Sequence, residues 1–349
     1  SVDEALAGHA SNISVVLHSD GAIEVQDDGR GMPIDLHPEH GVSGVELILT
    51  KLHAGGKFSS SSYRFSGGLH GVGGSGVNAL SAHLKAEVQR DGWQYFQEYV
   101  QGKPTGELQR ESKTSDHGTT ITFQPDPEIF PIIEYDFEML ISHFKEIAYL
   151  NKGLRINFTS LWHEDQRKGD VERTYYFDGG IANLVRNVNR NRRVMQKLPF
   201  YYGKTVDDTA VEVAIQYNDS FSETVYSFAN CINTQEGGTH LTGFRSALTR
   251  VINDYARRQG FIKEDQPNLT GDDVREGVQR FLRSSGERVS PIPREAARRR
   301  GAAIEREQNL RGGREARSHA RGLGGVIGCT IRSLVQTIGH QRAQRVDSP

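Results

Sequence analysis

The chain has 349 residues, enough for two ordinary domains, and its 36% hydrophobic and 25% charged residues are the composition of a soluble globular protein. No apolar run approaches the roughly 20 residues that span a bilayer, and Cys231 and Cys329 form no CxxC pair, so a membrane protein is excluded and a reducing cytoplasm fits better than a disulfide framework or a zinc site. The net charge of −2 hides a division, because residues 1–277 carry 27 Lys and Arg against 38 Asp and Glu, whereas residues 278–349 carry 15 Arg, no Lys and 6 acidic residues.

The first expected domain covers residues 1–170. It opens on Ser1–Leu6, which has no initiator Met and reads as the middle of a helix, so we expect a fragment of a longer chain. A Gly/Ser-rich stretch over 55–76 is too long for a simple turn. We place the end of the domain in the polar stretch 164–170, although strand character continues at 174–177. Apolar patterning and turn residues predict strands at 13–18, 22–27, 84–101, 118–123 and 156–158, and helices at 45–49, 77–81 and 137–150.

The second expected domain covers residues 171–277. Strands are predicted at 211–217 and 224–230, and a turn at 236–239 leads into a helix over 240–259. No internal repeat occurs at the spacing of a solenoid. The pattern therefore predicts a smaller unit of strands and one long helix.

The stretch Gln26–Pro33 (QDDGRGMP) places a carboxylate at the end of an expected strand. Such a carboxylate can accept a hydrogen bond from the amine of adenine, and the glycines let the backbone approach a flat base closely. An acidic turn at the end of a hairpin is the plainer interpretation, and it would prevail for an Asp-Gly pair that stood alone.

The stretch Ser66–Gly74 (SGGLHGVGG) sets several glycines directly before a helix. Consecutive backbone N–H groups at the positive end of a helix dipole suit a triphosphate. Gly71, Gly73 and Gly76 also satisfy the GxGxxG spacing of dinucleotide-binding folds, but that fingerprint needs a buried strand before it, and serines stand there instead. A Walker A loop fails as well, because Gly56-Lys57 is followed by Phe58.

Two shorter pieces complete the set. Lys57, in HAGGKF, can meet a phosphate as a point charge, with Tyr63 nearby in the sequence as an aromatic that can form hydrogen bonds. Thr119, which follows Gly118, can reach the adenine region through a water. Taken singly, these residues are better explained as a solvated loop lysine and an ordinary strand threonine.

The order and spacing of these four pieces resembles the ATP site shared by DNA gyrases, histidine kinases and related GHKL ATPases. The longer strings DEALAGH, DDGRGMPIDLHPE, LHAGGKF, SYRFSGGLHGVG and VNALS are similar to the B subunits of bacterial type II topoisomerases in particular, and EGGTHLTGFRSALTR and LTGDDVREG extend the resemblance to residue 277. The resemblance implies an α+β fold. It consists of a GHKL ATPase sandwich, in which helices cover a mixed, mostly antiparallel sheet, followed by a βαβ-containing transducer domain.

The resemblance also implies a set of site residues. Asp27 is expected to bind adenine and to share a bridging water with Thr119. Glu4 and Arg30 match a supporting salt bridge, and Arg90 matches an arginine at the mouth of the site. The full set implied to bind ATP is Asp27, Gly31, Met32, Pro33 and Ile48 around the base, Lys57 and Tyr63 in the pocket, Gly68, Leu69, His70, Gly71, Val72, Gly73 and Gly74 in the phosphate loop, and Thr119.

Three departures from the family pattern limit what the resemblance implies. The general-base Glu and the magnesium-binding Asn belong to an E-x-x-D-N motif immediately before the position of Ser1, so we expect no catalytic residue and no metal ligand within the chain. Gly76 stands where a Val is usual, so we expect the helix beside the phosphate loop to start late or to fray. The Q-T-K triplet that contacts the γ-phosphate should fall where the chain has Arg294-Glu295-Ala296.

The same resemblance implies cofactors and partners. ATP with Mg²⁺ would close a homodimer of B subunits and drive the passage of double-stranded DNA, in a heterotetramer with two A subunits. Two alternatives stay open: an ATP-binding module that does not hydrolyse ATP, and the B subunit of topoisomerase IV instead of that of gyrase. A histidine kinase is disfavoured, because no phosphoacceptor helix precedes the site and GGTHLTGFR has no place in one.

Residues 278–349 read as a different kind of sequence. Many Arg without Lys, a single aromatic residue (Phe281) and repeated Gly-Gly pairs are what a GC-rich gene gives when it is read out of frame. We therefore expect a change of reading frame near Gly277, the loss of a core strand of the transducer and poor order in the tail. The rival interpretation is a basic tail that grips DNA phosphates, which its charge balance would permit.

Overall fold

The computed structural model describes residues 1–52, 72–206, 209–220, 223–234 and 236–286. They fall into two compact units, Ser1–Asn183 and a second that begins at Leu184. The first unit ends later than the position expected near residue 170, because β9 (Glu172–Tyr176) pairs with β8 (Arg155–Ser160) and completes the first sheet. No helix in the described ranges is long and apolar enough to cross a membrane.

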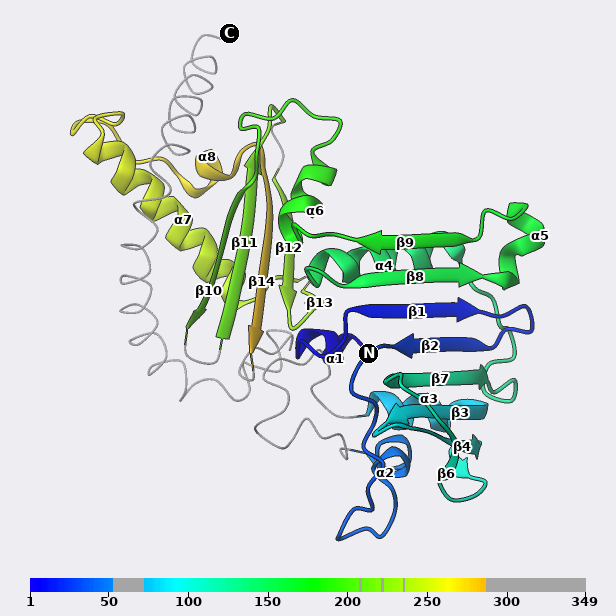
Figure 1. The fold of residues 1–349 in the computed structure, drawn as a ribbon. Coiled ribbons are helices and arrows are strands. Elements are labelled where there is room, and N and C mark those ends of the chain that lie inside the picture. Colours follow the sequence, from blue (N-terminus) through cyan, green and yellow to red (C-terminus); the bar gives the residue numbers. More distant parts are fainter. Residues whose placement is uncertain (53–71, 207–208, 221–222, 235, 287–349) are drawn as a thin grey trace. The chain divides into compact units, whose positions relative to one another are not determined.

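The first unit is built on one sheet, whose strands run in the order β5-β4-β3-β7-β2-β1-β8-β9, with β6 paired to β4 (Figure 1). Its pairings are antiparallel except for β1 with β8, so among the described strands the sheet is mixed and mostly antiparallel, as predicted. The remaining strands are β1 (Asn12–Leu17), β2 (Ile23–Asp27), β3 (Ser81–Arg90), β4 (Trp93–Val100), β5 (Lys103–Pro104), β6 (Gln109–Lys113) and β7 (Gly118–Pro125).

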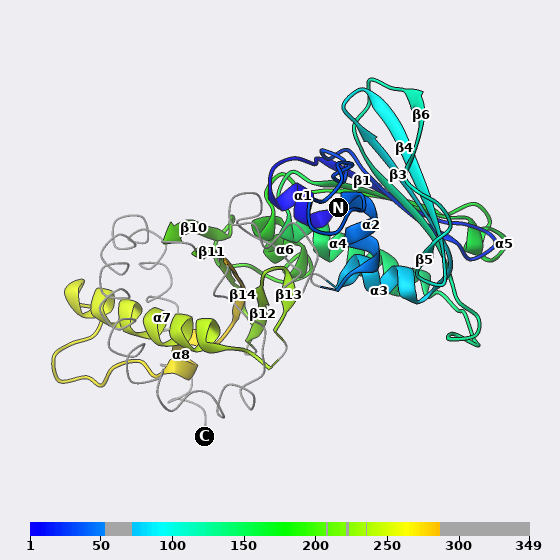
Figure 2. The same ribbon diagram turned by 90° about the horizontal axis from the view of Figure 1, so that it is seen from below.

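Helices cover one face of this sheet. Alternation sends Ile13, Val15 and Leu17 of β1 into a core with α4, whose first turn is capped by the Asp136 side chain. A second core packs α2 against β3 and β4 (Figure 2). The helices are α1 (Val2–Leu6), α2 (Gly44–Thr50), α3 (Gly73–Ala79), α4 (Phe137–Leu150), η2 (Leu161–His163) and α5 (Glu164–Arg167).

The helix α3 corrects two expectations. It begins at Gly73, so it does not start late despite Gly76, and it ends at Ala79, so Ser81 opens β3 and is not helical. Asn78, 1% exposed, donates hydrogen bonds to the backbone oxygens of Leu49 (2.9 Å) and Gly102 (3.3 Å). These tertiary bonds hold the helix where glycine propensity alone would favour fraying.

The second unit has a five-stranded sheet in the order β10-β11-β14-β12-β13. β12 and β14 are parallel neighbours, and the long helix α7 lies between them in the chain, so they form the predicted βαβ unit. Apolar residues of β11, β14, α7 and α8 share one core. The boundary between the units falls within α6 (Ile181–Val188). The elements that follow it are β10 (Phe200–Val206), β11 (Thr209–Tyr217), β12 (Thr224–Ala229), β13 (Ile232–Asn233), α7 (Thr239–Arg258), α8 (Gly271–Arg275) and β14 (Val278–Gly286).

The strand β14 overturns the expectation that a core strand is lost after Gly277. It lies in the middle of the sheet, between β11 and β12. Phe281 is fully buried and stacks on Phe228 with ring centroids 4.7 Å apart. Arg283 is buried too, and it donates hydrogen bonds to Glu212 Oε2 (3.2 Å) and Cys231 Sγ (3.3 Å). The sheet of the second unit thus continues to residue 286, and the rest of the expected out-of-frame segment lies outside the described residues.

Candidate functional site

Asp27 ends β2 and lies opposite Thr119, near the start of β7. The two residues are 6% and 8% exposed. Asp27 Oδ2 accepts a hydrogen bond from the Ser1 hydroxyl (2.7 Å), with the Ser1 amino nitrogen 3.7 Å away, and Oδ1 accepts one from the Gly29 amide (3.0 Å). A carboxylate has about four acceptor positions, so this one keeps room for a further donor. A nearly buried carboxylate with spare acceptor capacity suits the amine of a ligand.

Close packing around the turn after Asp27 requires glycine at two places, Gly31 in the turn and Gly118 at the start of β7. Gly31 has φ +76°, and a Cβ there would lie 2.8 Å from the Gln89 carbonyl oxygen. Gly118 has φ +140°, and a Cβ there would overlap the carbonyl oxygen of Asp27. Only residues without side chains let these backbones pack so closely. The glycines therefore bring the turn against β3 and β7.

Three side chains hold the same turn by its backbone. Arg90 Nη1 donates to the Gly31 carbonyl oxygen (2.9 Å), and Thr119 Oγ1 accepts from the Met32 amide (3.1 Å). His117 Nδ1 lies 2.8 Å from the Gly29 carbonyl oxygen. Thr119 and Arg90, both predicted site residues, thus touch the turn that carries Asp27.

Two residues of the turn, Arg30 and Asp28, form ion pairs or hydrogen bonds with residues outside it. Arg30 and Glu4 form the predicted salt bridge in a bidentate arrangement, with N···O distances of 3.0 and 3.2 Å. Asp28 accepts hydrogen bonds from the Ser11 hydroxyl and from the backbone amides of Ser11 and Asn12, at 2.7–2.8 Å. Burial alone would raise the pKa of the Asp28 carboxyl, but these hydrogen bonds outweigh it and hold the pKa below its ordinary value. Asp28 is therefore engaged in the structure, which leaves Asp27 as the carboxylate suited to a ligand.

The apolar residues predicted around a base lie next to the turn. Met32 is half-buried and packs against the core beneath α2, and Pro33 lies against Gly44 at the start of α2. Ile48, further along α2, faces α3, since its Cγ2 is 3.6 Å from the position of a Cβ on Gly74. Met32 and Pro33 thus lie against α2, and Ile48 belongs to that helix.

The phosphate side is described only in part. Val72 is the N-cap residue of α3, and Gly73 and Gly74 are its first two residues. Lys57, Tyr63, Gly68, Leu69, His70 and Gly71 lie outside the described residues.

Two contacts of the site had no counterpart among the sequence-based expectations, those of Ser1 with Asp27 and of His117 with Gly29. Ser1 lies 26 positions from its partner and His117 lies 88 positions from its own. The signal available for His117 was its position directly before Gly118 and Thr119, in a motif already assigned to the site.

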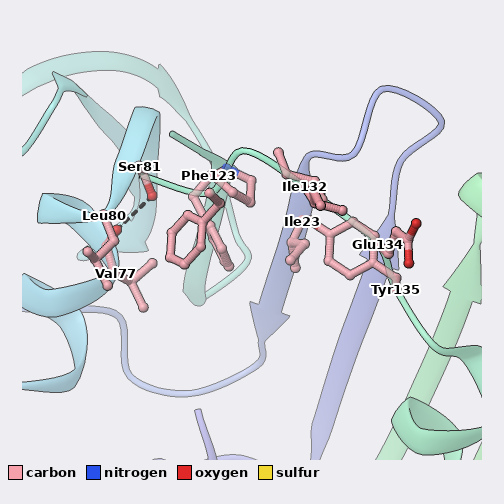
Figure 3. A pocket seen from close by; sticks show the side chains of 11 residues that line it. Ile23, Val77, Leu80, Ser81, Phe123, Ile132, Glu134 and Tyr135 are labelled. Carbon is pink, nitrogen blue, oxygen red and sulfur yellow. Dashed lines mark hydrogen bonds between the residues drawn. The ribbon is translucent and has the colours of Figure 1, made fainter. Parts of the chain in front are cut away.

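An apolar hollow of about 290 Å³ lies at the other end of β2 and β7 (Figure 3). Ile23, Phe123, Val77 and Leu80 line it, and Glu134 is the only charged side chain among the described residues of its wall. The Ser81 hydroxyl, also in the lining, is already bonded to the Val77 carbonyl oxygen (2.6 Å). These described wall residues offer no buried acceptor like Asp27, so the polar site at the turn is the stronger candidate for a nucleotide base.

Comparison with known proteins shows which family this chain belongs to. Residues 1–129 match the model of histidine kinase-, DNA gyrase B-, and HSP90-like ATPases, and residues 180–286 match that of DNA gyrase B. The 43K ATPase domain of Thermus thermophilus gyrase B, solved with an aminocoumarin, is 32% identical with a TM-score of 0.70, over 92% of this chain and 89% of that one. The chain belongs to the DNA gyrase B family.

The chain is also similar to a whole gyrase B subunit and to a topoisomerase IV domain. The DNA gyrase B subunit of Clostridium acetobutylicum is 48% identical over 279 residues, which are 80% of this chain and 43% of that protein. The topoisomerase IV ATP-binding domain of Francisella tularensis, solved with a small-molecule inhibitor, is 27% identical with a TM-score of 0.72, over 99% and 90% of the two chains. The match covers 43% of the Clostridium acetobutylicum protein, so the chain spans less than half the length of that curated relative. The DNA gyrase B match extends to residue 286, which agrees with the place of β14 in the sheet.

Proposed function

We propose that the first unit binds ATP, with Asp27 reading the adenine amine, and that the chain is the ATPase and transducer part of the B protein of a gyrase-type topoisomerase. The observation that carries the proposal is the cross-strand pair Asp27 and Thr119, both nearly buried, beside the glycine-containing turn that follows Asp27. Membership of the gyrase B family supports it.

Recognition of the base follows from hydrogen-bond chemistry. A carboxylate only accepts, so Asp27 suits the donating amine of adenine and disfavours the carbonyl that guanine has at the same place. The Thr119 hydroxyl oxygen already accepts a hydrogen bond from the Met32 amide. Its O–H group can donate a hydrogen bond to a water that also contacts the base. Met32, Pro33 and Ile48 supply apolar surface on which a flat ring can lie. We assign the phosphates to the glycine-rich segment that ends at Gly74, with Mg²⁺ as their counter-ion.

Function in the whole protein rests on the relatives. Binding of ATP would close a dimer of B subunits and drive strand passage in double-stranded DNA, together with two A subunits. The second unit, through residue 286, would act as the transducer that passes the nucleotide state onward. A chain that binds ATP without hydrolysing it is the alternative, and ATP turnover measured with and without DNA separates the two.

The test of the proposal is a matched pair of substitutions. Asp27→Asn should weaken a nonhydrolysable ATP analogue by about 1–3 kcal/mol, because an amide can turn a donor toward the adenine amine. Asp126 is also a buried carboxylate of the first unit, 4% exposed, but it is bonded to Gln101 and to the Glu128 amide instead. Asp126→Asn should leave the affinity unchanged. Calorimetric titration of both variants with the analogue measures the two affinities. An affinity of Asp27→Asn equal to that of the unsubstituted protein would contradict the assignment of Asp27 to adenine.

A further inference from the structure

We propose that His117 is a positioning residue for adenine recognition, which acts through Gly29 on the Asp27 carboxylate. The inference rests on the proposed function, because that function assigns the adenine amine to Asp27. It concerns a residue that does not itself touch the nucleotide.

The chain of contacts has two links. His117 Nδ1 lies 2.8 Å from the Gly29 carbonyl oxygen. A carbonyl oxygen only accepts, so Nδ1 carries the hydrogen and His117 is the donor. The amide of the same residue, Gly29, donates to Asp27 Oδ1 at 3.0 Å. Gly29 is therefore held on its carbonyl side by His117, and on its amide side it holds the carboxylate.

Gly29 needs such a tether because it has no side chain of its own to fix it. A Cβ at this position would lie 2.8 Å from Asp27 Oδ1, so a side chain there would displace the carboxylate. Glycine has the largest conformational freedom of any residue. Among the described residues, His117 is the side chain that hydrogen-bonds the Gly29 carbonyl, while Arg90 and Thr119 hold the turn at Gly31 and Met32.

His117 directly precedes the strand β7, so its backbone is placed next to the strand that pairs with β2. His117, Gly118 and Thr119 are consecutive, and each meets the turn in a different way: by a side-chain donor, by close backbone packing and by a side-chain acceptor. With Oδ1 fixed by the Gly29 amide, Oδ2 has a defined direction in which to accept. A preset acceptor loses less freedom when a base binds, which strengthens binding of a base that carries the amine.

The experiment compares His117→Ala with His117→Asn, since the amide nitrogen of Asn can take the place of Nδ1. Two probes are used, a nonhydrolysable ATP analogue and the same compound built on purine without the 6-amine. The ratio of the two affinities measures what the amine contributes, and it does not depend on how much of a variant is folded. His83→Ala, an exposed histidine on β3, is the control.

We expect His117→Ala to bind the ATP analogue about 3- to 10-fold more weakly, with little change for the purine compound. His117→Asn should restore the ratio, and His83→Ala should not change it. In an Asp27→Asn background, His117→Ala should have no further effect. An unchanged ratio in His117→Ala, or an equal loss with both probes, would overturn the inference. The two proposals fail separately: if Asp27→Asn alone weakens binding while His117→Ala does not, only the role of His117 falls. If Asp27→Asn binds normally, the adenine assignment falls and the role of His117 with it.

Discussion

Gly31 and Gly92 share a left-handed backbone but differ in their surroundings, which makes them a matched pair for a stability measurement. Their φ angles are +76° and +80°. A Cβ at Gly31 would lie 2.8 Å from a backbone oxygen, whereas one at Gly92 would meet no described atom within 4 Å. Gly92→Ala should therefore lower the free energy of unfolding by about 1 kcal/mol, through the backbone alone. Gly31→Ala should lower it by about 2–4 kcal/mol, because the clash adds to the backbone strain.

Urea unfolding of the two variants measures this difference, and titration with the ATP analogue adds a second comparison. Gly31 lies in the turn held by Arg90, so its substitution should also weaken the nucleotide. Gly92 lies in the β3–β4 hairpin, two positions after Arg90, but a methyl group there would meet no described atom within 4 Å, so its substitution should leave the affinity unchanged. Equal losses of stability in both variants would show that close packing at Gly31 is relieved by movement of its neighbours.

At the scale of elements, β14 is the strand that completes the second unit. Its Phe281 side chain is 0% exposed and stacks with the rings of Tyr226 and Phe228. Phe281→Ala should cost about 3–5 kcal/mol of unfolding free energy, the usual loss for a buried aromatic side chain. Leu198, 66% exposed in the same unit, is the control, and Leu198→Ala should change little. A small effect of Phe281→Ala, measured by denaturant unfolding, would mean that β14 contributes little to the core.

The elements that the sequence predicted well are those with strong local signals. The helix over 137–150 matches α4, because an Asp N-cap and apolar periodicity mark it. β14 was missed because its residues carry a misleading signal. An arginine such as Arg283 suggests a solvated surface, and only the fold shows that Glu212 and Cys231 lie beside it.

The candidate site divides in the same way. Asp27 was predicted from its motif, and so were the neighbouring glycines, since a carboxylate in a glycine-rich turn is visible in the sequence. That Asp27 lies opposite Thr119 depends on strand register, which becomes visible only when β2 and β7 are paired. The role of His117 depends on a contact across 88 positions, and its place directly before Gly118 and Thr119 does not show that Gly29 is its partner.

At the scale of the whole molecule, each unit has a core of its own. The first packs α4 and α2 against separate parts of one sheet, and the second packs α7 against β11 and β14. We therefore expect two heat-absorption peaks in calorimetry, one for each unit, in place of a single cooperative transition. A ligand that binds only the folded first unit should raise the temperature of that unit's peak. The stabilisation should be about 2.7 kcal/mol when the free ligand concentration is about a hundred times the dissociation constant.

Single variants assign the peaks. Phe281→Ala should lower the temperature of one peak. The temperature of the other peak and its response to the ATP analogue should stay unchanged. Asp27→Asn should abolish most of the nucleotide shift without moving the peak that Phe281→Ala lowers, because the ligand stabilises only the unit that binds it. A single peak that the ATP analogue shifts as a whole would contradict this expectation. It would mean that the two units unfold together as one cooperative body.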